Sequence, residues 1–327
     1  MLKKVGFLCV FILSLGLAPR HFVSAAPDFN VAPVLPANQV EPKHHYFDLL
    51  VTPNTTQNLT IQIQNTAAYS QRFLVSPNRA TTGQDGDIDY TTHAPTKAKS
   101  LTVDIEALLP KPKTYTVPPR TTRQITLHLQ TPTHSWDGIV LGAIRVKKLA
   151  TQTNAGITAD TAYTIGVQLR TTATLPTQPL MPQLTGVTMG RNGNDAQVIA
   201  KVENTTAAIQ PGVQVKTTIH RVGQTKLLRQ HTQKGIRMAP NAVLKFDPGV
   251  AQHALSPGHY QLALTVDQGR STWHFTKTFT IAKTQVKTTT THPKKATAPA
   301  IIPLLLLTAG ILLALTLIIL WRRQRKH

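Results

Sequence analysis

Hydrophobic side chains recur at every second position along much of the chain between residues 27 and 282. Leu59, Ile61 and Ile63 alternate with polar residues, and the same alternation covers residues 125–129, 260–266 and 273–281. A period of two is the pattern of a half-buried β-strand, and threonine, which favours strands, fills many of the polar positions. No long window between the two ends has the period of an amphipathic helix. The chain is therefore predicted to be all-β.

Turn sequences separate these alternating runs, as at Gly83-Gln-Asp-Gly86 and Pro257-Gly258. A polar segment of small residues, 151–160, divides the runs into two groups of similar size. Each group has enough short strands for one sandwich. We predict two tandem immunoglobulin-like β-sandwich domains, at residues 29–150 and 160–282.

The first 25 residues have the features of a signal peptide. Lys3 and Lys4 precede an apolar run, and Val23-Ser-Ala25 ends in the small residues that a signal peptidase reads. We expect cleavage after Ala25. The single cysteine, Cys9, lies inside this segment. An exported chain without it has no disulfide, so its fold must depend on core burial alone.

The C-terminal end has the features of a membrane anchor. Residues 300–320 carry no charge, and at about 1.5 Å per residue they would cross a hydrocarbon core of about 30 Å. Residues 321–327 are rich in arginine and lysine, which favour the cytoplasmic side. Residues 283–298 are rich in threonine and lysine and read as an extended stalk. We expect a single-pass membrane protein whose ectodomain is extracellular and whose C-terminus is cytoplasmic.

The predicted ectodomain is basic, with 24 basic and 14 acidic residues and a net charge of +10. Such a surface suits an anionic partner, and export makes nucleic acid an unsuitable one. Outside a membrane, the anionic polymers at hand are those of the cell wall or of a glycosaminoglycan matrix, and we expect one of these as the partner. The alternative is that the charge serves only solubility.

Two groups of residues are candidates for sites. Asp85, Asp87 and Asp89 alternate after a glycine turn, which suits either a calcium ion or a hydrogen-bonded turn. Trp136 precedes an apolar run in the sequence Trp136-Asp-Gly138. It is a candidate binding residue that would stack on a sugar or anchor a partner, and the alternative is a buried corner residue. Trp273 falls on the same alternation as Phe275, Phe279 and Ile281, which predicts that its side chain lies in the core.

The chain lacks the common motifs of catalysis. It has no Gly-x-Ser-x-Gly elbow, no His-Glu-x-x-His pair and no paired carboxylates of a glycosidase. We expect a protein that is not an enzyme, with no catalytic residue, cofactor or resident metal.

Several strings, taken in order, carry a resemblance to a known family. They are Tyr46-Phe-Asp-Leu49, Ile61-Gln-Ile-Gln-Asn65, Asn78-Arg-Ala-Thr-Thr-Gly-Gln-Asp-Gly-Asp-Ile-Asp-Tyr90, Pro132-Thr-His-Ser-Trp-Asp-Gly-Ile-Val-Leu-Gly142, Ala162-Tyr-Thr-Ile-Gly-Val-Gln-Leu169, Val202-Glu-Asn204, Met238-Ala-Pro-Asn241 and Pro257-Gly-His-Tyr260. Together they resemble the WxL-interacting proteins of Gram-positive bacteria. Two local departures, Asn54 and Ala143, stand where that family commonly has glycine.

This resemblance implies a first domain of the peptidoglycan-binding type and a second of the host-binding type. It also implies WxL-domain proteins and host matrix proteins as partners. None of the tryptophans is followed by leucine two residues on, so this chain would be the partner of a WxL protein. No sortase motif precedes the predicted span, which favours a lasting membrane anchor. The alternatives are an enzyme or accessory subunit acting on wall polymer, and a secretion factor that donates strands.

Overall fold

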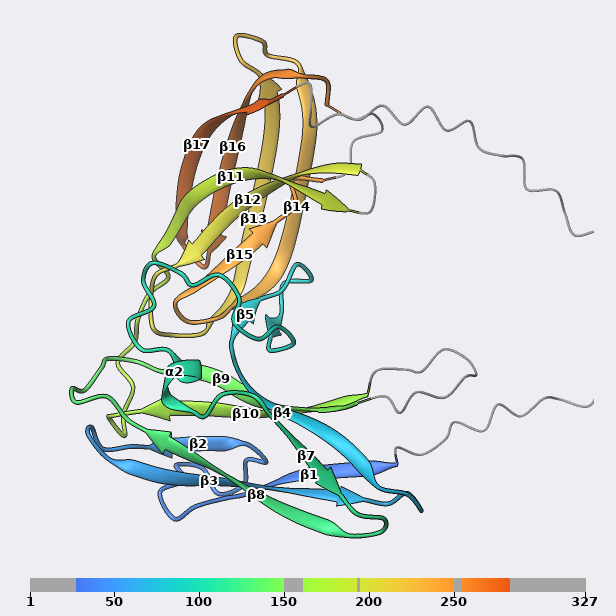
Figure 1. The fold of residues 1–327 in the computed structure, drawn as a ribbon. Coiled ribbons are helices and arrows are strands. Elements are labelled where there is room, and N and C mark those ends of the chain that lie inside the picture. Colours follow the sequence, from blue (N-terminus) through green and yellow to red (C-terminus); the bar gives the residue numbers. More distant parts are fainter. Residues whose placement is uncertain (1–27, 150–160, 193–194, 250–254, 283–327) are drawn as a thin grey trace, which may run out of the picture. The chain divides into compact units, whose positions relative to one another are not determined.

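The computed structural model describes residues 28–149, 161–192, 195–249 and 255–282 (Figure 1), and the regular secondary structure of these residues is almost entirely β. The strands before residue 150 are β1 (Phe29–Val34), β2 (Phe47–Leu50), β3 (Thr56–Asn65), β4 (Gln71–Arg79), β5 (Thr81–Thr82), β6 (Ile88–Asp89), β7 (Lys113–Val117), β8 (Thr122–Gln130) and β9 (Val140–Lys148). Those after residue 160 are β10 (Ala162–Arg170), β11 (Pro182–Asn192), β12 (Asp195–Asn204), β13 (Gln210–Arg221), β14 (Leu227–Met238), β15 (Ala242–Phe246), β16 (Gly258–Gln268) and β17 (Ser271–Ile281). One short helix, α2 (Ile105–Leu108), interrupts them. The all-β prediction is confirmed.

The predicted signal peptide 1–25, stalk 283–298, span 300–320 and tail 321–327 lie outside the described residues. Among the residues that the structure describes, no helix has the length and apolar character needed to span a membrane.

The first half of the described chain packs two sheets over one core. One sheet has the strand order β1-β3-β8, and the other, here called the β9 sheet, has the order β2-β10-β9-β4-β7. The alternating residues Leu59, Ile61 and Ile63 of β3 are fully buried against residues of the β9 sheet such as Val167. The predicted parity of these strands is therefore correct.

The second half also has two sheets. The β12 sheet has the order β11-β12-β15-β5-β6, and the β13 sheet has the order β14-β13-β16-β17. Fully or almost fully buried residues from both sheets, such as Val202 of β12 and Leu264 of β16, lie at alternate positions. The inward side chains of the two sheets thus form the second core.

The two halves exchange strands. The predicted boundary assigned residues 162–169 to the second domain, but β10 pairs antiparallel with β9 and parallel with β2 in the first half. In the other direction, β5 of the first half pairs parallel with β15 through Thr82 and Leu244. Strands β9 and β10, which the polar segment 151–160 separates in the sequence, are therefore antiparallel neighbours in one sheet. The division of the chain into domains at 29–150 and 160–282 stays a prediction.

A buried asparagine ends an equivalent strand in each half. Asn65 closes β3 and donates to the carbonyls of Tyr69, Val117 and Pro118 at 2.8–3.0 Å. Asn204 closes β12 and donates to the carbonyls of Ala208 and Ala239 at 3.0 and 2.9 Å. Both side chains are fully buried, and each Oδ1 accepts from the amide two residues later. Each asparagine therefore satisfies carbonyls in a loop or at the end of a strand.

We predict that Asn204→Ala lowers the free energy of unfolding of the fragment 27–282 by about 2–3 kcal/mol, because it leaves buried carbonyls without a donor. Asn58→Ala, which removes an exposed asparagine bonded to His128, should cost less than about 1 kcal/mol. Urea unfolding followed by circular dichroism measures both. Equal losses in the two variants would contradict a special role for the buried amide.

Candidate binding site

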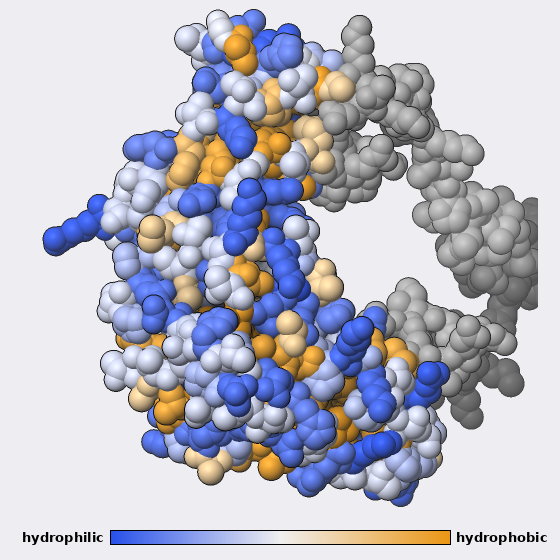
Figure 2. Space-filling view, turned by 60° about the vertical axis from the view of Figure 1, so that its left-hand side comes forward, coloured by the Kyte–Doolittle hydropathy of each residue, from blue (hydrophilic) through white to orange (hydrophobic). Residues whose placement is uncertain are grey.

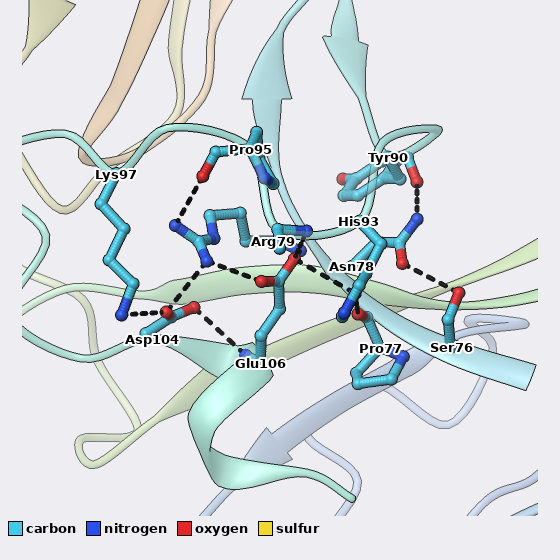
Figure 3. Close-up of polar contacts among 11 residues, drawn as sticks. Ser76, Pro77, Asn78, Arg79, Tyr90, His93, Pro95, Lys97, Asp104 and Glu106 are labelled. Carbon is cyan, nitrogen blue, oxygen red and sulfur yellow. Dashed lines mark hydrogen bonds and ion pairs between the residues drawn. The ribbon is translucent and has the colours of Figure 1, made fainter. Parts of the chain in front are cut away.

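A buried guanidinium lies where the first half meets the second. Arg79, at the end of β4, is 7% exposed. Its Nη2 lies 2.6 Å from Glu106 Oε2 and 3.2 Å from Asp104 Oδ2, and its Nη1 donates to the carbonyl of Pro95 at 3.2 Å (Figure 3). Asp104 is also the N-cap of α2. The helix thus presents two carboxylates to one cation, which offsets the cost of burying it.

The same carboxylates hold the loop 91–99 (Figure 3). Glu106 Oε1 accepts from the backbone amide of Ala94 at 3.0 Å, and Asp104 Oδ2 lies 2.7 Å from Lys97 Nζ. Ala94 has a positive φ of 50°, a conformation that costs free energy for a residue other than glycine. The hydrogen bond to Glu106 helps to hold this backbone in place.

Two contacts connect the end of this loop to the second half. The amide of Ser100 donates to Glu203 Oε1 at 2.9 Å, and Asn241 Nδ2 donates to the carbonyl of Ser100 at 3.1 Å. Glu203 lies on β12 and is 2% exposed. The buried carboxylate therefore fixes the loop against the outer face of the β12 sheet.

A groove of about 590 Å³ lies between the loop 91–99 and that outer face, lined on its two walls by Lys99 and by Lys201 and Lys245. Lys201 and Lys245 are direct cross-strand partners on β12 and β15. Like charges placed opposite one another destabilise a sheet. Within the described part of the chain, none of these three lysines forms an ion pair with a carboxylate.

The two acidic residues that line this groove already have partners. Asp89 accepts from the amide and hydroxyl of Thr91, and Glu203 accepts from Ser100 as described. The lysine groove, defined by Lys99, Lys201 and Lys245, thus offers three ammonium groups to a ligand. Its chemistry suits carboxylate or phosphate groups.

Trp136, the candidate binding residue, is buried. It is 9% exposed, belongs to the core of the first half, and its carbonyl accepts from the Thr171 hydroxyl at 2.7 Å. Its indole nitrogen has no hydrogen-bond partner among the residues that the structure describes. This placement matches the alternative of a buried corner residue. A role for Trp136 in binding stays a prediction.

Asp85, Asp87 and Asp89 lie in and beside the β5–β6 hairpin, and their carboxylates have different partners. Asp85 Oδ1 accepts from the amide of Asp87. Asp87 Oδ1 lies 3.8 Å from Arg237 Nη1, and Asp89 Oδ1 accepts from the amide of Thr91. These contacts are those of a hydrogen-bonded turn. Among the described residues, no group of three or more His, Cys, Asp or Glu side chains is placed to hold a metal.

Sequence reasoning missed both the Arg79 cluster and the lysine groove. Arg79 stands inside one of the strings that resemble the family, but its partners Asp104 and Glu106 lie farther along the chain, beyond β5 and β6. Lys201 and Lys245 lie between buried neighbours on their strands. That pattern predicts an exposed side chain, but it does not say which strand lies beside it.

Comparison with protein-family models finds two matches. Residues 29–148 match the peptidoglycan binding domain of the WxL Interacting Protein, and residues 152–291 match its host binding domain. Both models describe binding domains. No curated protein sequence matches the chain.

Several solved structures share a low similarity with the chain. A chain from a chaperone–tip adhesin complex of CFA/I fimbriae has 8% identity and a TM-score of 0.29, over 77% of this chain and 99% of that one. The class 5 fimbriae chaperone CfaA has 7% identity and a TM-score of 0.27, over 76% and 99%. The E. coli chaperone DraB has 17% identity and a TM-score of 0.26, over 70% and 92%. Scores this low add nothing to the assignment.

We predict that Arg79→Met lowers the free energy of unfolding of the fragment 27–282 by about 3–5 kcal/mol, because Glu106 stays buried without the guanidinium that it faces and Asp104 keeps only Lys97. Lys97→Met removes a cation whose side chain is 58% exposed, so it should cost less than about 1 kcal/mol. Urea unfolding measures both variants. If Arg79→Met costs no more than Lys97→Met, the buried cluster does not stabilise the junction.

Tyr90 lines a second groove, and burial raises the pKa of its phenol to about 12, although the charge of Arg237 lowers it. Since the unfolded phenol titrates near pH 10, its neutral form contributes stability below pH 10 that is lost as the pH rises toward 12. We predict that Tyr90→Phe reduces the fall in unfolding free energy between pH 10 and 12 by about 2 kcal/mol. Denaturant titrations across this range measure it, and identical pH profiles for the two proteins would refute the assignment.

Proposed function

Because the chain belongs to the WxL-interacting protein family, we propose that it is a bacterial cell-surface protein that binds peptidoglycan, WxL-domain proteins and host proteins. In this proposal residues 1–25 export the chain, and residues 300–320 anchor it in the membrane. Residues 283–298 form the stalk, so the ectodomain is extracellular and the C-terminus cytoplasmic. The two halves of the ectodomain are immunoglobulin-like sandwiches that bind and do not catalyse.

The lysine groove is the feature that supports peptidoglycan as the wall ligand. The stem peptides of peptidoglycan carry free carboxylates, and Lys99, Lys201 and Lys245 present ammonium groups without acidic partners among the described residues. The Arg79 cluster keeps the loop that carries Lys99 in position. A polyanion would therefore meet a preorganised cationic surface, which lowers the entropy cost of binding.

The cross-strand position of Lys201 and Lys245 strengthens this proposal. Their mutual repulsion costs stability in the free protein, and a bound anion between them would remove that cost. A carboxylate that bridges the two side chains gains attraction from both. The basic charge of the whole ectodomain, +10, would also attract the wall polymer from a distance at low salt.

We predict that the double variant Lys201→Ala, Lys245→Ala weakens binding of the detergent-solubilised full chain to purified peptidoglycan by about tenfold, or 1.4 kcal/mol. Lys216→Ala serves as the matched control, because Lys216 is an exposed strand lysine on β13. Co-sedimentation at several salt concentrations gives the affinity, and the double variant should also show a weaker salt dependence.

Equal binding by the double variant and the wild type would exclude the lysine groove as the ligand site. Failure of the wild-type chain to sediment with peptidoglycan would exclude the wall-binding function itself. Binding that falls equally in the control variant would show that only overall charge matters.

A further inference from the structure

One side of the second sandwich is incompletely covered. The side chains of Trp273, Phe275 and Phe279 on β17 have the inward parity of their strand but are only half-buried. On the neighbouring strand β16, their register partners Val266, Leu264 and Tyr260 are no more than 1% exposed. The opposite sheet therefore covers β16 fully and β17 only in part.

Strand β11 of the opposite sheet contacts β17, and its inward side chains are also only partly buried. Its inward residues Leu184 and Val187 pair with Val202 and Ala200 of β12, which are fully buried, yet they are themselves only partly buried. Within the described residues, β11 is the last strand of the β12 sheet, and β17 is the last strand of the β13 sheet. Figure 2 brings the left-hand side of Figure 1, where β11 and β17 lie, toward the viewer. Hydrophobic residues are visible at the surface of the second sandwich in that view.

The other side of the same sandwich is closed by an added strand. There β5 pairs with β15, and Ala239, next to β14, donates its amide to the Thr82 hydroxyl of β5 at 3.0 Å. The inward residues Ile236 and Met238 of β14 are fully buried. The β12 sheet thus gains a strand from outside its own half at one edge, whereas no strand of the described residues pairs with the free edge of β11.

The incompletely covered row of β17 also carries a positive charge. Lys277 lies in the inward row of β17 between Phe275 and Phe279 and is exposed, and its side chain has no hydrogen bond or ion pair within the described part of the chain. A lysine at an inward position calls for a carboxylate on whatever covers it.

We propose that β11 binds one extended strand of a partner protein along its free edge. The partner strand carries apolar side chains at alternate positions, which cover Trp273, Phe275 and Phe279, and an acidic side chain that faces Lys277. Backbone hydrogen bonds to β11 supply affinity, and the alternating side chains supply specificity. The lysine groove also touches β11 through Thr185 and Thr188, but neither Lys277 nor the apolar row of β17 lines it. Variants at Lys277 therefore test this site without altering the groove.

The composition of the chain argues against its own stalk as the occupant. Residues 283–298 have a valine and two alanines among threonine and lysine, and no acidic residue. That segment offers neither the apolar row nor the carboxylate. A partner strand with alternating apolar residues and an acid meets both needs.

The test uses the full chain in lipid nanodiscs and a peptide of about nine residues, with valine alternating with threonine and glutamate replacing one central valine. Hydrogen exchange should slow at residues 182–189 when this peptide binds. Lys277→Glu should weaken its binding by about tenfold or more. A second peptide, with lysine in place of the glutamate, should bind Lys277→Glu better than it binds the wild type. Lys216→Glu, on β13, is the matched charge control and should leave both affinities unchanged.

Each other outcome overturns the proposal. Peptide binding that does not slow hydrogen exchange at residues 182–189 would show nonspecific hydrophobic contact. The same conclusion would follow if Lys277→Glu did not reverse the preference between the glutamate peptide and the lysine peptide. Protection of β11 that depends on protein concentration, with dimers in light scattering, would assign the edge to a second copy. Protection without peptide that disappears when residues 283–298 are replaced by a Gly-Ser linker would assign it to the stalk.

Discussion

The junction of the two halves depends on the charge of one buried side chain. Arg79 is a buried guanidinium, and a buried cation is stable only beside opposite charges and hydrogen-bond acceptors. These acceptors come from two segments, the start of α2 with Asp104 and Glu106 and the loop that contains Pro95. Because β4 carries the arginine, the cluster joins β4, the start of α2 and the loop that contains Pro95. These three segments do not belong to a common sheet or helix. The position of Lys99 relative to β12 and β15 follows from it.

The alternation of apolar residues was sufficient to predict strand type and inward faces. Leu59, Ile61 and Ile63 are fully buried as their period requires. Trp273 shows the limit of this reasoning, since parity predicted core but the side chain is half-buried at a sheet edge. A period of two identifies the inward face, but it does not say whether another strand covers that face.

The strings that carried the family resemblance have a physical explanation in the structure. Asn65 and Asn204 end two of them. The side-chain amide of Asn65 donates to the carbonyl of Val117 at the end of β7, and that of Asn204 donates to the carbonyl of Ala239 just after β14. By contrast, the Arg79 cluster and the pairing of Lys201 with Lys245 join residues that lie far apart in the sequence. No local pattern reports such contacts, because they arise from strand register and loop path.

The exchange of β5 and β10 has a consequence for the way the chain can be divided. The two family matches meet at residues 148 and 152, but a cut there separates β10 from β9 and β2, with which it shares a sheet. The shorter N-terminal piece would expose long unpaired edges, and the C-terminal piece would begin with an apolar strand that has no sheet to join. Both are conditions for aggregation. The two binding modules are therefore separable in sequence models but mutually dependent for solubility.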